Sequence, residues 1–121
     1  MFPSVQIERV AKRIGRACQA EQVILFGSHA RGDAREASDV DFLVIAESDL
    51  PRFKRARALH AMFRPYPFAI DILVYTPEEV KRGAQNPLSF VSTALREGKT
   101  VYVGTDGGRQ TVARRVSPGV V

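Results

Sequence analysis

Four residues in one short stretch have the types and the spacing that suit metal and phosphate chemistry. Gly27 and Ser28 end one apolar run, and Asp39 and Asp41 stand where the next apolar run begins. Alternate residues of a strand point to the same face, so we expect the two carboxylates side by side. Such a pair is costly unless water or a cation neutralises it. Because Mg²⁺ prefers oxygen ligands, the stretch predicts a magnesium site.

Gly27 and Ser28 supply the complementary half of this predicted site. Gly27 allows a sharp turn as the strand ends, after which backbone N–H groups can receive phosphate oxygens. Ser28 adds a hydroxyl group and Arg31 adds a positive charge. A third acid, Asp71, interrupts the otherwise apolar run 68–75, where a lone carboxylate needs a partner. A phosphate cradle that faces carboxylates is what a Mg²⁺–nucleoside triphosphate requires.

The run GSHARGDAREASDVD resembles the signature of the DNA polymerase β-like nucleotidyltransferases, and more narrowly of the minimal nucleotidyltransferases of bacteria and archaea. In that family Gly-Ser is followed at a fixed spacing by Asp-x-Asp, and a third Asp lies on a later strand. Gly27, Ser28, Asp39 and Asp41 match this pattern, and Asp71 stands where the third carboxylate is expected. The resemblance extends from the first predicted helix to about residue 103.

The resemblance implies transfer of a nucleoside monophosphate from a triphosphate, with ATP as the expected donor, to an acceptor hydroxyl group. Asp39 and Asp41 would hold one Mg²⁺ ion and would share a second with Asp71 next to the acceptor. These three residues are therefore the predicted catalytic and metal-binding residues. The resemblance also assigns the β- and γ-phosphates to Gly27 and Ser28. Arg31 would offset charge on the departing pyrophosphate.

The resemblance also implies a partner. Minimal nucleotidyltransferases pair with small helical HEPN-type toxins, so we expect a HEPN-type protein as the acceptor and an antitoxin role for this chain. Two alternatives stay open: an enzyme that modifies a small molecule such as an aminoglycoside, and a non-catalytic module that neutralises a partner by contact. A homo-oligomer also stays open. We interpret His29 as an exposed loop residue and the basic run 52–57 as a solvated helix face, with nucleic acid as the alternative partner.

Composition limits the class of protein. The 121 residues suit one domain, and a net charge of +5 with a pI near 9.9 indicates either an anionic partner or a solvated basic surface. Cys18 is the only cysteine, so no internal disulfide is expected and a reducing cytoplasm is the default location. No apolar run is long enough to span a membrane, and we identify no signal peptide.

Strands are expected to alternate with helices along the chain. The predicted helices cover residues 4–20, 51–63 and the two segments that begin at Thr76-Pro77 and Asn86-Pro87; the predicted strands cover 23–26, 40–45, 68–75 and 100–103. Phe53 of the second helix and Leu88 and Leu95 of the last are expected to face inward. We expect Cys18 to pack in the core.

This alternation predicts an α/β (α+β) domain with a small mixed sheet. The resemblance implies the nucleotidyltransferase fold, with helices packed mainly on one face of the sheet and the site at its open edge. We assign residues 1–103 to this domain. Residues 104–121 are polar, basic and without periodicity, which predicts a flexible tail.

Overall fold

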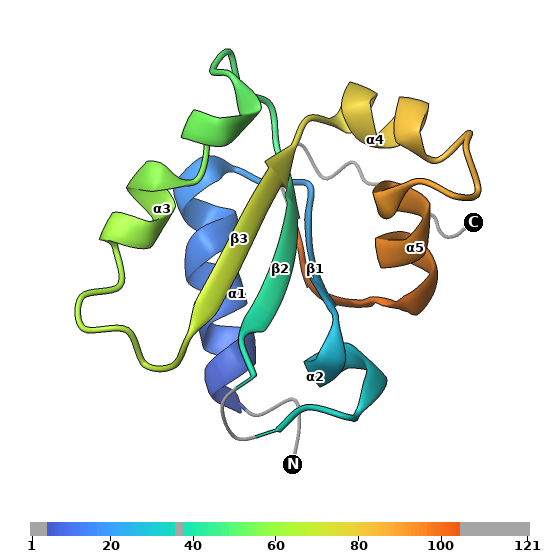
Figure 1. Ribbon diagram of the computed structural model, residues 1–121. Coiled ribbons are helices and arrows are strands. Elements are labelled where there is room, and N and C mark those ends of the chain that lie inside the picture. The colour runs from blue at the N-terminus through green and yellow to red at the C-terminus, as the bar shows by residue number, and fades with distance from the viewer. Residues whose placement is uncertain (1–4, 36–37, 105–121) are drawn as a thin grey trace.

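Four strands form one mixed sheet in the computed structural model, which describes residues 5–35 and 38–104 (Figure 1). The elements in chain order are α1 (Val5–Cys18), β1 (Gln22–Phe26), α2 (Ser28–Arg31), β2 (Val40–Ile45), the 3₁₀ turn η1 (Arg52–Lys54), α3 (Arg57–Ala61), β3 (Ile70–Tyr75), α4 (Pro77–Gly83), α5 (Phe90–Glu97) and β4 (Lys99–Val103). The strand order is β3-β2-β1-β4. β1 runs antiparallel to β2 and β4, whereas β2 and β3 are parallel. The predicted mixed sheet is confirmed.

One face of the sheet carries the main core. The apolar stripe of α1 lies against this face, and Figure 1 shows α1 behind the strands. Ile7 and Ile14 of α1 are fully buried there, together with Phe42 of β2 and Phe63, which follows α3. Cys18 packs against this core, and its thiol donates a hydrogen bond to the carbonyl of Ile14 at 3.2 Å. Burial raises the pKa of the Cys18 thiol, which agrees with its predicted packing role.

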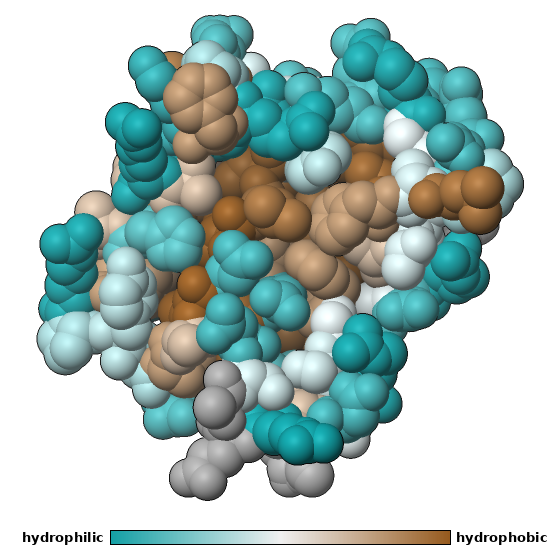
Figure 2. Space-filling model, in the orientation of Figure 1, coloured by the Kyte–Doolittle hydropathy of each residue, from teal (hydrophilic) through white to brown (hydrophobic). Residues whose placement is uncertain are grey.

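The opposite face is covered at one end only. A smaller buried cluster joins Ile24, Leu43, Ile45 and Ala94, where α5 packs on the sheet. Because β2 alternates, Asp41 projects from the same face as Leu43 and Ile45. Figure 2 shows this face with apolar surface gathered in its middle and hydrophilic residues around it. We call it the open face.

The predicted second helix is wrong in its length. Residues 51–63 form the short turn η1 and the five-residue helix α3 instead of one continuous helix. The amides of Lys54 and Arg55 donate to carbonyls three residues back, which is the tighter 3₁₀ pattern. Phe53 therefore lies outward and is 75% exposed, although it was expected to face the core.

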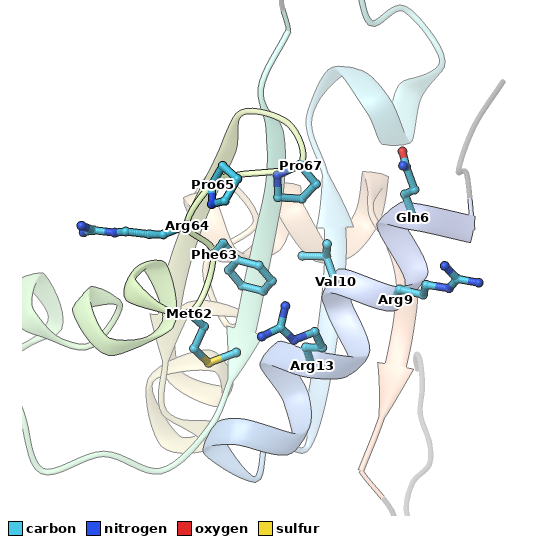
Figure 3. Close-up of a pocket in the computed structure, with 9 residues that line it drawn as sticks. All are labelled: Gln6, Arg9, Val10, Arg13, Met62, Phe63, Arg64, Pro65 and Pro67. Carbon is cyan, nitrogen blue, oxygen red and sulfur yellow. The ribbon is translucent and has the colours of Figure 1, made fainter.

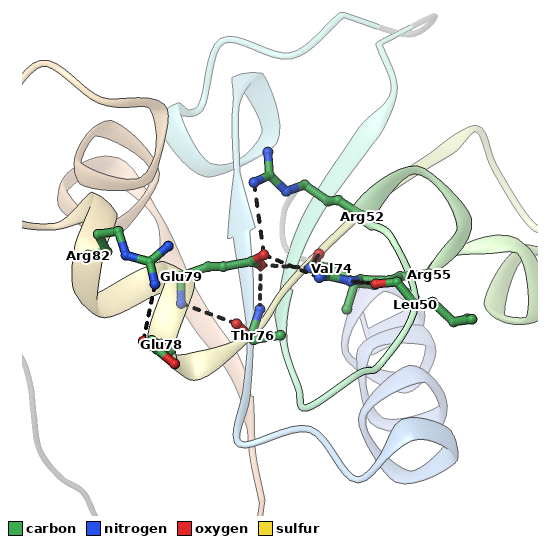
Figure 4. Close-up of polar contacts among 8 residues, drawn as sticks. All are labelled: Leu50, Arg52, Arg55, Val74, Thr76, Glu78, Glu79 and Arg82. Carbon is green, nitrogen blue, oxygen red and sulfur yellow. Dashed lines mark hydrogen bonds and ion pairs between the residues drawn. The ribbon is translucent and has the colours of Figure 1, made fainter.

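An ion pair of a buried arginine lies at this break. The Arg55 side chain is only 8% exposed and donates to both Glu79 carboxylate oxygens, at 2.6 and 3.2 Å (Figure 4). It also donates to the carbonyls of Leu50 and Val74. The expectation that the basic run is a solvated face is thus wrong for Arg55. Its contacts join the segment after β2 to the end of β3 and the start of α4.

Of the two helix starts predicted near the C-terminal end, one is confirmed and the other is wrong. Thr76 and Glu79 form a reciprocal capping box at the start of α4, as the Thr76-Pro77 sequence indicates. α5 begins only at Phe90, because the hydroxyl of Ser89 accepts a hydrogen bond from the amide of Ser92. The expected start at Asn86-Pro87 is therefore wrong.

The same displacement changes which side chains of this segment are buried. Leu88 lies before α5 and is 91% exposed, and Leu95 is also exposed, against expectation. The strand predicted over 68–75 begins only at Ile70. No helix within the described residues is long and apolar enough to cross a membrane. Residue 4, where the first predicted helix begins, and the predicted tail from residue 105 onward lie outside the described residues.

Candidate active site

Two of the predicted carboxylates stand side by side on the open face. Asp41 on β2 pairs with Asp71 in the register of the parallel strand β3, so both side chains leave the sheet on the same side. Asp41 is half-buried and Asp71 is exposed. Asp39 lies two residues before Asp41, just outside the strand, and is exposed. The structure therefore places Asp41 and Asp71 side by side, with Asp39 two residues before Asp41 in the chain.

The electrostatics of Asp41 reflect this crowding. Its pKa is raised above the usual value, first by burial, then by the negative charge of Asp71 and that of Asp39. His29 and Arg31 act in the opposite direction and lower the pKa of Asp41. The site thus holds clustered negative charge with two basic groups beside it.

Gly27 approaches Asp41 closely, at the point where β1 ends. Its backbone has φ +77° and ψ −155°, a conformation essentially restricted to glycine. A Cβ atom added at Gly27 would collide with Oδ2 of Asp41. The glycine therefore serves both the turn and the space that the carboxylate occupies.

The short helix α2 places Ser28 and Arg31 next to this turn. The amides of Ala30 and Arg31 donate to the carbonyl of Gly27, and Gly32 ends the helix in the left-handed conformation. Ser28 is half-buried. Arg31 forms ion pairs with Asp33 at 3.3 Å and with Glu97 at 3.8 Å. Arg31 is therefore near the carboxylates, but its charge is shared with two acids outside the predicted set.

His29 is buried, whereas the sequence interpretation placed it on an exposed loop. Its side chain is 8% exposed, and Nε2 lies 3.3 Å from the carbonyl oxygen of Ser38. This contact joins α2 to the residue that precedes Asp39. No local sequence signal identified it, because the two residues in contact are nine positions apart in the chain.

The donor set suits a hard divalent cation. All three groups are carboxylates. The pKa of Asp41 is raised first by burial and then by the charges of Asp71 and Asp39, and a bound cation would offset both effects. Within residues 5–35 and 38–104, no three His, Cys, Asp or Glu side chains converge closely enough to form a complete metal site. The oxygen donors fit Mg²⁺ by their chemistry. Their arrangement is a neighbouring pair, Asp41 and Asp71, with Asp39 close to Asp41 in the chain.

A separate hollow lies between α1 and the segment that leads to β3. It measures about 350 Å³ and is basic at its rim (Figure 3). Its lining residues are Gln6, Arg9, Val10, Arg13, Met62, Phe63, Arg64, Pro65 and Pro67. The guanidinium of Arg13 lies over the ring of Phe63, 4.8 Å from its centroid. Because Val10 and Phe63 belong to the main core, this hollow is on the side of α1 and not on the open face.

Comparison with protein families identifies the same region of the chain. A family model described as "Nucleotidyltransferase domain" matches residues 6–66. The stretch includes Gly27, Ser28, Asp39 and Asp41, whereas Asp71 lies beyond it.

Three curated relatives come from Methanocaldococcus jannaschii, and each is named "Putative protein adenylyltransferase". MJ0141 is 41% identical over 54 residues, which cover 45% of this chain and 54% of the relative. MJ1305 is 42% identical over 74 residues, with 54% and 48% covered. MJ0604 is 30% identical over 82 residues, with 68% and 78% covered. The chain thus spans about half the length of the first two relatives and most of the third.

Two solved structures share the fold. A crystal structure of a putative nucleotidyltransferase from Sulfolobus solfataricus aligns with a TM-score of 0.54 at 22% identity, covering 82% of each chain. A crystal structure described as a toxin–antitoxin with AMP-PNP aligns with a TM-score of 0.56 at 19% identity, covering 79% of this chain and 73% of that one. At these identities the likeness establishes the fold.

Proposed function

The chain belongs to the nucleotidyltransferase domain family, and we propose that it transfers AMP from ATP to a hydroxyl group of a partner protein. The observation that carries this proposal is the pairing of Asp41 with Asp71 on the open face, next to the turn at Gly27. Phosphoryl transfer needs an acceptor and a triphosphate held in line, with their charge balanced. The carboxylates and the Gly27 turn offer these two functions at the end of the sheet where β1 ends and β2 and β3 begin.

In the proposed reaction the acceptor hydroxyl oxygen forms a bond to the α-phosphorus of ATP. The bond from that phosphorus to the α–β bridging oxygen breaks, and pyrophosphate leaves with the bonding electrons. Asp71 is the proposed acceptor of the hydroxyl proton, because it is the exposed carboxylate of the pair. Asp39, Asp41 and Asp71 would hold Mg²⁺, which when bound supplies Lewis acidity at the reacting phosphate.

The groups around the turn receive the triphosphate in this proposal. Ser28 offers its hydroxyl and the first turn of α2 to the phosphate oxygens, and Gly27 keeps the space between them and Asp41 free of a side chain. Arg31, whose charge acts on Asp41, is the residue that would offset charge on the pyrophosphate. To do so it must exchange its contacts with Asp33 and Glu97 for the phosphate.

A protein acceptor is favoured by two lines of support. The curated relatives each carry the name "Putative protein adenylyltransferase", and one structure of the same fold is described as a toxin–antitoxin. We propose that the partner is a HEPN-type toxin and that this chain is its antitoxin. The gene next to that of this protein is the natural source of the partner to test.

The experiment is a transfer assay with two differently labelled donors. The protein, Mg²⁺ and the purified product of the adjacent gene are incubated with ATP labelled at the α-phosphate or at the γ-phosphate. We expect the α-label on the partner and no γ-label. Asp71→Asn should abolish transfer, whereas Asp49→Asn should retain it, because exposed Asp49 follows the opposite end of β2. Partner binding without any label would instead indicate a non-catalytic module.

A further inference from the structure

Three aromatic rings continue from the carboxylates across the open face. Phe26 is the partner of Asp41 in the antiparallel register of β1 and β2, so the two side chains are neighbours on one face. The ring of Phe90, the first residue of α5, lies edge-on to Phe26 with centroids 5.2 Å apart. Tyr75 is tilted against Phe90 at 5.9 Å. We call Phe26, Phe90 and Tyr75 the aromatic row.

The aromatic row is not enclosed as a core would be. Phe90 is 39% exposed and the other two rings are half-buried, whereas Phe42 and Phe63 in the main core are almost fully buried. Below the row lies the smaller buried cluster of the open face. Ring surface is therefore available to a ligand beside a cluster of polar groups, which is the composition of a binding site.

We propose that the aromatic row stacks the base of the nucleoside triphosphate. This inference rests on the proposed function and adds the subsite that the base occupies. Phe26 directly precedes Gly27, so a triphosphate received at the turn presents its nucleoside to the row. An aromatic side chain can stack on any type of nucleobase, because every base has a π-face. The row is thus an apolar, partly exposed surface that begins next to the proposed phosphate site.

The far end of the row is limited by a charged group. The guanidinium of Arg52 lies over the ring of Tyr75, 4.5 Å from its centroid, and reaches within 4.0 Å of Glu79. Arg52 therefore covers one face of Tyr75 and leaves Phe90 and Phe26 as the stacking surface. Because stacking strength increases with ring area, purine triphosphates should bind more tightly than pyrimidine triphosphates.

The test separates the base from the phosphates. Binding of ATP and of inorganic tripolyphosphate to the full chain is measured by calorimetry with Mg²⁺ present. We expect ATP to bind more tightly than tripolyphosphate, and Phe90→Ala to weaken ATP binding by about 5- to 150-fold while leaving tripolyphosphate unchanged. Phe90→Tyr should keep ATP affinity. Leu88→Ala is the matched control, because Leu88 is two residues away and 91% exposed.

Each outcome bears on the inference in a defined way. Equal affinity of the wild-type chain for ATP and tripolyphosphate would overturn the inference. An equal loss of affinity for both ligands in Phe90→Ala, with an unchanged melting temperature, would overturn it as well. Unchanged ATP affinity in Phe90→Ala, together with loss of transfer to the partner, would assign the row to the acceptor instead. If the wild-type chain binds tripolyphosphate in any of these cases, the proposed function is retained and only the inference about the aromatic row is rejected. A wild-type chain that binds neither ligand would overturn both proposals.

Discussion

Replacing Gly27 by alanine tests the structural basis of the site most directly. The backbone at φ +77° and ψ −155° is expected to cost a side-chain-bearing residue ~1–3 kcal/mol. The added Cβ also collides with Oδ2 of Asp41, and an overpacked position of this kind costs ~1–3 kcal/mol. Together these terms lower the free energy of unfolding of Gly27→Ala by ~2–6 kcal/mol.

Gly32 offers a matched control in the same loop. It also has a positive φ, +88°, but its ψ of 10° is in the left-handed helical region, and an added Cβ would meet nothing within 4 Å. Gly32→Ala should therefore cost ~1–2 kcal/mol and leave ATP binding intact. In Gly27→Ala, Asp41 must move or the turn must open, so ATP binding in the presence of Mg²⁺ should be lost.

A double-mutant cycle separates the two costs at Gly27. In Gly27→Ala combined with Asp41→Ala, the collision is absent and only the backbone term remains, so the two changes should couple favourably by ~1–3 kcal/mol. Urea denaturation followed by circular dichroism gives the free energies of unfolding, and calorimetry gives ATP affinity. The reasoning is refuted if Gly27→Ala is no less stable than Gly32→Ala and binds ATP with wild-type affinity.

Two further predictions concern charge. Asp41→Asn should abolish transfer but leave the free energy of unfolding at pH 7 equal or higher, because the folded state raises the pKa of Asp41. The gain in stability should vanish as the pH falls below the ordinary pKa of aspartate. A variant less stable than the wild type at pH 7 would contradict this reasoning. Arg55, with further contributions from the amide of Thr76 and the charge of Arg52, lowers the pKa of Glu79 from 4.5 to about 2. The associated stability is therefore present above pH 4.5 and is lost as the pH falls towards 2. By this linkage, Glu79 alone should lower the free energy of unfolding by about 2 kcal/mol between pH 7 and pH 3. Arg55→Met should lower the free energy of unfolding at pH 7 by ~3 kcal/mol and remove most of this pH dependence. Urea denaturation at both pH values measures these changes.

The sequence by itself determined the features that depend on neighbours in the chain. The span of β2 and the capping box of Thr76 with Glu79 follow from alternation and from side-chain bonds that reach three residues. The pairing of Asp41 with Asp71 was expected from the family resemblance. It is realised because β2 and β3 are parallel and in register. These features account for the sheet and for the carboxylates of the candidate site.

Only the tertiary structure decided which side chains meet across long separations. In the sequence Arg55 is one basic residue among several in the run 52–57. In the structure it donates hydrogen bonds to both the carboxylate of Glu79 and the carbonyl of Val74, and the turn η1 stands where a continuous helix was expected. The burial of His29 and the exposure of Phe90 depend in the same way on how a loop and α5 dock. The periodicity of a sequence indicates local backbone geometry, whereas burial depends on residues that are distant in the sequence. The aromatic row could therefore be identified only from the tertiary structure.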